Sequence, residues 1–245
     1  MELNKYIDHT NLKAYATKEY IKKLCDEAIK YKFASVCVNP CYVELASSLL
    51  EGTNIEVCTV IGFPLGANNV RTKEYEAIIA VEDGATEIDM VINIGALKDK
   101  DYNYIKEEIE SIRDAIDGNT LKVIIETCYL TDDEIKKMTE ICNETFVNFI
   151  KTSTGFGTRG ASVHDVEIMN KYRNEILEIK ASGGIKDIKF AEELINVGAT
   201  RLGTSSGVDL MQKECDCDEC HCHEDGCHCH EDGCHCHDCE CEGDE

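Results

Sequence analysis

The chain has 245 residues and carries 25 Lys and Arg against 48 Asp and Glu, a formal net charge of −23. This acidic excess, without a basic stripe, excludes a typical nucleic-acid binder. No stretch reaches the ~18 apolar residues of a membrane span, and the first residues lack an apolar run of signal-peptide length. We therefore expect a cytoplasmic protein that binds neither nucleic acid nor membrane.

Composition divides the chain into two segments. Residues 1–214 hold 25 Lys and Arg against 36 Asp and Glu and are numerous enough for one large core. Residues 215–245 contain only Cys, His, Asp, Glu and Gly, among them 10 Cys and 6 His. Because none of these can build an apolar core, we expect a folded domain over 1–214 and a tail over 215–245 that is disordered without a ligand.

Apolar runs and capping residues predict alternating strands and helices along residues 6–203. In chain order, the strands are predicted over residues 6–10, 33–38, 56–61, 87–92, 121–126, 146–150, 176–180 and 200–203. The helices between them are predicted over residues 18–30, 42–50, 71–82, 102–116, from a capping box at 131–134, 162–172 and 187–195.

The predicted strands are nearly continuous apolar runs, which indicates burial on both faces, as in a parallel sheet. Eight strand–helix units of this kind favour a (β/α)8 TIM barrel, an α/β fold. A doubly wound open sheet is the alternative, but no Gly-x-Gly-x-x-Gly follows the first strand to support it.

Polar residues lie towards the carboxyl ends of the predicted strands, where barrel active sites are found. They are Asp8, Asn39, Asp89, Glu126, Lys151 and Lys180. Asp89 interrupts an apolar strand, so it is either a structural acid paired with a cation or a carboxylate that moves protons. Asp8 and Thr10 fit either a turn cap or a support of the site, and both alternatives stay open.

Lys151 and Lys180 occupy equivalent places at the ends of neighbouring strands. A lysine in such a place usually extends to the surface. Here a Thr-Ser-Thr-Gly turn follows Lys151 at once, and a second lysine is expected beside it. Two neighbouring ammonium groups favour loss of a proton from one of them, which yields a neutral amine that can attack a carbonyl.

Two small-residue loops follow the last two predicted strands, and each precedes a helix. Such loops let backbone N–H groups approach an anion, assisted by the helix N-terminus. Barrel enzymes frequently bind phosphate at this pair of loops. The candidate phosphate-binding residues are Gly183, Gly184, Gly203, Ser205 and Ser206.

Six segments, in order between residues 3 and 210, together resemble one known family. They are Asp8-His-Thr-Asn-Leu, Gly62-Phe-Pro-Leu-Gly66, Glu87-Ile-Asp89-Met-Val, Phe149-Ile-Lys151-Thr-Ser-Thr-Gly155-Phe-Gly157, Lys180-Ala-Ser-Gly-Gly184 and Gly203-Thr-Ser-Ser206. This set is similar to deoxyribose-phosphate aldolases, and its Lys-Thr-Ser-Thr-Gly part is the most specific.

The resemblance implies a class I aldolase of deoxyribonucleotide catabolism. It would reversibly cleave 2-deoxy-D-ribose 5-phosphate to D-glyceraldehyde 3-phosphate and acetaldehyde, with no cofactor. Lys151 would form the Schiff base, Lys180 would keep Lys151 partly neutral, and Asp89 would relay protons. The glycine and serine loops would hold the phosphate of this phosphorylated sugar, and a homodimer is a candidate assembly.

One departure from the family's usual sequence is Arg159, where relatives usually have glycine. If that position needs positive φ, Arg159 is strained. Alternatively, Arg159 adds a cation near the phosphate. A second departure is the tail, which replaces final residues that in some relatives reach back towards the site.

The tail repeats a Cys-His-Cys-His unit with a period of seven residues. Thiolates and imidazoles at this density bind metals such as Zn²⁺ or Cu⁺. The simpler hypothesis is that residues 215–245 are an acidic, repeat-expanded tail without a selected function. The alternative function for the chain is a metal-buffering or metal-sensing protein, with the barrel as carrier. The candidate ligands are Cys220, His221, Cys222, His223, Cys227, His228, Cys229, His230, Cys234, His235, Cys236 and His237.

Overall fold

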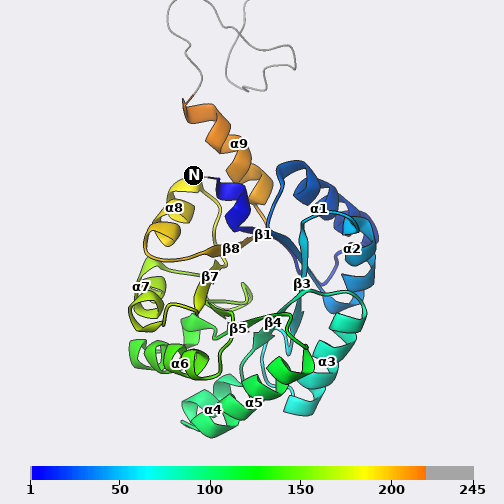
Figure 1. Cartoon of the computed structure of the whole chain (residues 1–245). Coiled ribbons are helices and arrows are strands. Elements are labelled where there is room, and N and C mark those ends of the chain that lie inside the picture. The colour runs from blue at the N-terminus through cyan, green and yellow to red at the C-terminus, as the bar shows by residue number, and fades with distance from the viewer. Residues whose placement is uncertain (1, 219–245) are drawn as a thin grey trace, which may run out of the picture.

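Eight parallel strands close into a barrel in this computed structural model, which describes residues 2–218, with the backbone alone from residue 213 (Figure 1). Each strand pairs with its neighbours in chain order, and the last pairs with the first. The TIM barrel is therefore confirmed, and the open-sheet alternative is wrong. The strands are β1 (Ile7–Asn11), β2 (Ser35–Val38), β3 (Glu56–Ile61), β4 (Glu87–Val91), β5 (Thr120–Ile124), β6 (Phe149–Lys151), β7 (Glu178–Ser182) and β8 (Arg201–Thr204).

Helices surround the barrel and cover the outer faces of its strands (Figure 1). They are α1 (Lys18–Tyr31), α2 (Val43–Leu50), α3 (Val70–Glu82), α4 (Ile94–Lys98), α5 (Tyr102–Ala115), α6 (Asp132–Glu144), α7 (Val163–Tyr172), α8 (Ile188–Asn196) and α9 (Gly207–Asp218). Short 3-10 turns are η1 (Leu3–Tyr6), η2 (Pro40–Tyr42) and η3 (Thr127–Tyr129). In the described part of the chain, no helix is long and apolar enough to cross a membrane.

Side-chain caps start several helices where the sequence predicts them. The Thr17 side chain accepts a hydrogen bond from the Tyr20 backbone N–H at the start of α1. Thr131 and Glu134 form the predicted capping box at the start of α6, each bonding the backbone N–H of the other. These caps fix where the helices begin, and thereby how long the preceding loops at the barrel mouth are.

The sixth strand is shorter than predicted and begins later. Phe146 was expected to start it, but Phe146 has φ 53° and is 69% exposed. A left-handed residue directly after the C-cap Thr145 ends α6 and prevents the chain from entering the sheet at that point. As a result β6 begins at Phe149, and its last residue is Lys151.

Two further differences concern helices. The five-residue helix α4 was not predicted, because it is too short to show a periodic pattern. Helix α9 extends to Asp218 and so crosses the expected boundary between residues 214 and 215. The division into a barrel and a tail otherwise remains a prediction. The candidate metal ligands between residues 220 and 237 lie outside the described residues.

Candidate active site

Strand register brings four charged residues together inside the barrel. Lys151 of β6 is the direct partner of Lys180 on β7, and Asp89 of β4 is the direct partner of Lys122 on β5. Directly paired residues of a sheet project from the same face. All four side chains are at most 3% exposed. The interior of the barrel therefore holds a carboxylate and three lysines that solvent cannot satisfy.

Asp89 is the centre of this cluster, and its two carboxylate oxygens have different partners. Oδ2 accepts hydrogen bonds from the Nζ atoms of Lys151 and Lys180, each at 2.7 Å. Oδ1 accepts from Lys122 Nζ at 2.9 Å and from Cys58 Sγ at 3.1 Å. Burial alone would raise the pKa of Asp89, but the three lysine charges outweigh it and hold that pKa well below its usual range.

A second layer of charge surrounds Lys180. Its Nζ lies 2.5 Å from Asp8 Oδ2, in an ion pair whose angles fall outside hydrogen-bond geometry. Arg201 Nη1 donates to Asp8 Oδ1 at 2.7 Å and to Glu87 Oε1 at 3.2 Å. Burial alone would lower the pKa of Lys180, but the carboxylates of Asp8 and Asp89 outweigh it and raise that pKa well above its usual range. Both carboxylates therefore favour the charged form of Lys180 near neutral pH.

Three acidic and three basic groups thus make a balanced network beneath Lys151. Lys122 completes it by donating to Glu87 Oε2 at 2.7 Å. Because the six charges cancel without Lys151, a neutral amine at that position leaves the network electrically neutral. The acidic members are Asp8, Glu87 and Asp89, and the basic members are Lys122, Lys180 and Arg201.

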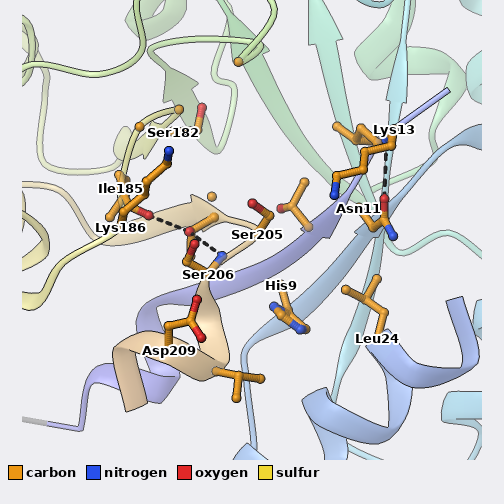
Figure 2. A pocket seen from close by; sticks show the side chains of 18 of the residues that line it. His9, Asn11, Lys13, Leu24, Ser182, Ile185, Lys186, Ser205, Ser206 and Asp209 are labelled. Atoms are coloured by element: carbon orange, nitrogen blue, oxygen red, sulfur yellow. Dashed lines mark hydrogen bonds between the residues drawn. The ribbon is translucent and has the colours of Figure 1, made fainter. Parts of the chain in front are cut away.

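A cavity of about 570 Å³ opens above this network, at the carboxyl ends of the strands. Lys151 lines it, whereas Lys180 does not. Figure 2 shows Ser182, Lys186, Ser205 and Ser206 gathered on one side of the cavity. The other predicted phosphate residues, Gly183, Gly184 and Gly203, also line the cavity, as do Thr10 and His9.

Glycine is required at two adjacent positions of this phosphate-side wall. Gly183 and Gly184 have φ of 85° and 79°, which side chains rarely adopt. Helix α9 begins at Gly207, directly after the Ser205–Ser206 turn, so its N-terminus faces the same region. The Ser206 N–H already donates to Thr204 Oγ1 at 2.9 Å, which fixes the turn. This wall therefore has the small residues and the helix dipole that an anion site uses.

The DeoC/LacD aldolase family supplies a model that matches residues 3–213. The chain belongs to this family. It is 56% identical over 212 residues to the deoxyribose-phosphate aldolase of Finegoldia magna, covering 86% of this chain and 100% of that relative. A second relative, from Clostridium tetani, is 54% identical over 214 residues, with 87% and 99% covered. A solved structure of deoxyribose phosphate aldolase from Aeropyrum pernix matches with TM-score 0.82 at 30% identity, covering 87% and 91%.

Most residues predicted for the aldolase site do come together. Asp8 is a support and not a turn cap, because its carboxylate binds Lys180 and Arg201. Thr10 Oγ1 donates to the Asp8 carbonyl at 2.8 Å and lines the cavity. Two strand-end residues point elsewhere. The Asn39 side chain donates to the Lys13 carbonyl, and Glu126 accepts from the Thr154 N–H at 3.3 Å.

Neither expectation for Arg159 of the aldolase is met. Its φ is not positive, so the backbone there is not strained. Its guanidinium does not line the cavity and instead pairs with both carboxylate oxygens of Asp165, at 2.5 and 3.0 Å. Arg159 therefore contributes no charge directly to the predicted phosphate position.

Sequence reasoning missed four residues of the aldolase site. Lys122 lies within the apolar run of β5, and a charge within such a run was the signal that revealed Asp89. Glu87, the first residue of β4, is not enclosed by such a run. Arg201 starts β8 and gave no such signal. Lys186, one residue past Ile185, lines the cavity beside the glycine loop. Its spacing from the glycines was the available clue.

Cys37, Cys58 and Asp89 place ligand atoms within 4.8 Å of one another, close enough to suggest a metal site in the aldolase. Lys122 Nζ lies within this cluster, 3.3 Å from Cys58 Sγ and 2.9 Å from Asp89 Oδ1. Burial also raises the pKa of Cys58 well above its usual range, which disfavours the thiolate that binds metals. We therefore conclude that the Lys122 ammonium occupies the position that a metal ion would take.

The free energy of unfolding of the aldolase is expected to fall as the pH drops below about 4. Burial opposes ionisation of Asp8 and Asp89, but neighbouring cations lower both pKa values in the folded protein. Unfolded carboxyls titrate near about 4, so this stabilisation is complete above that pH and is lost as the pH falls towards the folded pKa values. Urea unfolding midpoints between about pH 7 and pH 3 measure the effect; midpoints that stay constant would contradict it.

Proposed function

We propose that this chain reversibly cleaves 2-deoxy-D-ribose 5-phosphate to D-glyceraldehyde 3-phosphate and acetaldehyde through an imine at Lys151. The observation that carries the proposal is the difference between the two lysines on Asp89 Oδ2. Lys151 reaches the cavity, while Lys180 is fully buried between two carboxylates. Lys180 is thus held as a cation, which leaves Lys151 as the amine that can meet a carbonyl.

The reaction begins when the Lys151 amine attacks C1 of the open-chain sugar and water is lost. The protonated imine then draws the electron pair of the C2–C3 bond, so that C1 and C2 become an enamine. The C3 hydroxyl gives up its proton, and C3 becomes the aldehyde of the three-carbon product. Protonation of the enamine at C2 and hydrolysis of the imine release acetaldehyde and restore Lys151.

Asp89 and the phosphate-side loops have separate roles in this proposal. Asp89, 2.7 Å from Lys151 Nζ, is ionised at rest and accepts and returns a proton as it relays protons between the imine region and the sugar through water. The phosphate binds at the N–H groups of the two loops and the start of α9, with Lys186 as a cation nearby. None of these steps requires a metal or an organic cofactor. A cytoplasmic location and a homodimer remain predictions.

The direct test is a cleavage assay on the purified full chain. Release of both acetaldehyde and D-glyceraldehyde 3-phosphate from 2-deoxy-D-ribose 5-phosphate is the expected result. D-Ribose 5-phosphate is the matched control substrate, because it differs only by a hydroxyl at C2. Failure to release either product, from a protein whose circular dichroism shows a folded barrel, would refute the proposal.

The Cys-His-Cys-His repeat favours a second candidate function, metal binding by the segment after Asp218. It would act beside the aldolase and need not take part in the chemistry. The eight Cys and six His of residues 219–245 would suffice for about three four-coordinate sites, with two ligands to spare. Although these ligands lie outside the described residues, their chemistry suits Zn²⁺ and Cu⁺.

Removing residues 219–245 is expected to abolish most Zn²⁺ binding, while cleavage activity is retained. The full chain should bind about three Zn²⁺ more than the shortened chain, which keeps α9 and all barrel cysteines. Metal content after dialysis against a weak chelator gives the difference. Equal metal content in the two proteins would refute the metal-binding candidate, and loss of activity with the segment would show that the segment contributes to the cleavage reaction.

A further inference from the structure

The loop between β6 and α7 is tied down by one arginine. Arg159 donates to both oxygens of the buried Asp165 in the first turn of α7, to the Thr127 carbonyl at 3.3 Å and to the Gly160 carbonyl at 3.0 Å. Thr127 Oγ1 also donates to Asp165 Oδ2, at 2.8 Å. Arg159 therefore joins three segments: its own loop, the turn after β5 and the start of α7.

The next residue rests directly on the predicted phosphate loop. A Cβ added to Gly160 would lie 2.1 Å from the Gly183 carbonyl oxygen, and one added to Gly183 would lie 2.9 Å from the Gly160 Cα. Ala161 N–H donates to the carbonyls of Ser182 and Gly183, at 3.0 and 3.2 Å. The segment held by Arg159 is thus the support behind Gly183.

We infer that Arg159, through its pair with Asp165, is a positioning residue for phosphate binding; this inference rests on the proposed function. The guanidinium does not line the cavity and acts through Gly160 on Gly183. The two Arg159 N–H donors that bond Asp165 hold the loop against Gly183, so that the N–H groups of Gly183 and Gly184 are in position to bind the phosphate. Lys151 lies at the end of β6, before the braced loop, and its Nζ hydrogen-bonds Asp89 on β4, so the imine position does not depend on the Arg159 contact. Arg159 therefore governs affinity for phosphorylated substrate and not the chemical step.

Arg159→Ala is expected to raise KM for 2-deoxy-D-ribose 5-phosphate and Ki for inorganic phosphate by about tenfold each. The value of kcat, and kcat/KM for unphosphorylated 2-deoxy-D-ribose, should change by less than about twofold. Arg159→Lys keeps the charge but not the two-pronged contact, so it should give an intermediate increase in KM. If Arg159→Ala does not fold, the KM and Ki values of Arg159→Lys test the inference instead.

Arg173→Ala is the matched control. Arg173 is also a loop-bracing arginine next to α7, but at its other end, where it donates to the Leu177 carbonyl at 2.9 Å and to Asn170 Oδ1 at 2.8 Å. Its loss should lower stability without changing Ki for phosphate. An unchanged phosphate Ki in Arg159→Ala, or an equal loss of kcat/KM for both sugars, would overturn the inference.

Failure of the proposed aldolase function and failure of the role of Arg159 give different experimental results. If the unaltered chain cleaves neither sugar, the proposed aldolase function is wrong. Calorimetric titration with inorganic phosphate then still tests Arg159, because it needs no turnover. Weaker phosphate binding in Arg159→Ala than in Arg173→Ala would support the positioning role, and equal binding would remove it.

Discussion

Lys151→Ala is expected to lower the cleavage rate by more than about 10⁴-fold, because no other amine can form the imine. Lys180 is too deeply buried to replace it, and it is held as a cation by Asp8 and Asp89. Lys13, Lys23 and Lys186 also line the cavity, but the cavity amine that bonds Asp89 is Lys151. Borohydride reduction in the presence of acetaldehyde measures the imine directly, as a two-carbon adduct on one peptide.

The adduct must map to the peptide that contains Lys151 and must be missing from Lys151→Ala. Lys186→Ala is the matched control, since it removes another cavity amine but should still give the adduct on Lys151. Circular dichroism establishes that each variant is folded. Substantial turnover by folded Lys151→Ala, or an adduct on a different lysine, would mean that the imine has been assigned to the wrong residue.

Lys180→Met should have the second-largest effect, a fall in turnover of about 10²- to 10³-fold near neutral pH. Its loss leaves Asp8 and Asp89 opposed by fewer cations. Loss of the ammonium that shares Asp89 Oδ2 with Lys151 then favours the charged form of the Lys151 amine over the neutral form. Activity should therefore recover in part as the pH is raised, and the pH–rate profile should move to the alkaline side.

Lys122→Met is the control for this prediction, because it removes an equally buried cation from the other oxygen of Asp89. Either change breaks a buried ion pair and costs about 3–5 kcal/mol, so unfolding curves must accompany the kinetics. A pH–rate profile that shifts for Lys180→Met and much less for Lys122→Met supports the specific role of Oδ2. If neither profile shifts, Lys180 does not control the charge of Lys151.

The barrel could be predicted from sequence because its signal is repeated eight times. Each apolar run is too short to identify a fold alone, but the alternation with helices is consistent along the chain. The strand from Phe146 failed because one left-handed residue outweighs a favourable apolar run. Such a backbone choice depends on how α6 ends and is not visible in residue type.

The site could be predicted only in part, because its contacts run across strands. Asp89, Lys151 and Lys180 each stand out within an apolar run, so the sequence identifies them singly. Which lysine reaches the cavity could not be predicted, because Lys151 and Lys180 are direct partners in the sheet and differ by the contact of Lys180 with Asp8 on the distant strand β1. The Arg201 contacts to Asp8 and Glu87 join residues far apart in the chain, so only the closed barrel reveals them.

The balanced interior network also restricts how this enzyme can diverge. A single substitution that removes one of its charges leaves an opposite charge buried without a partner. Neutral drift should therefore proceed through compensated double changes, such as loss of Lys122 together with Glu87, which bond at 2.7 Å. Across a lineage, the charges at these positions should change together, whereas Lys151, which lies outside the balance but forms the imine, should stay unchanged.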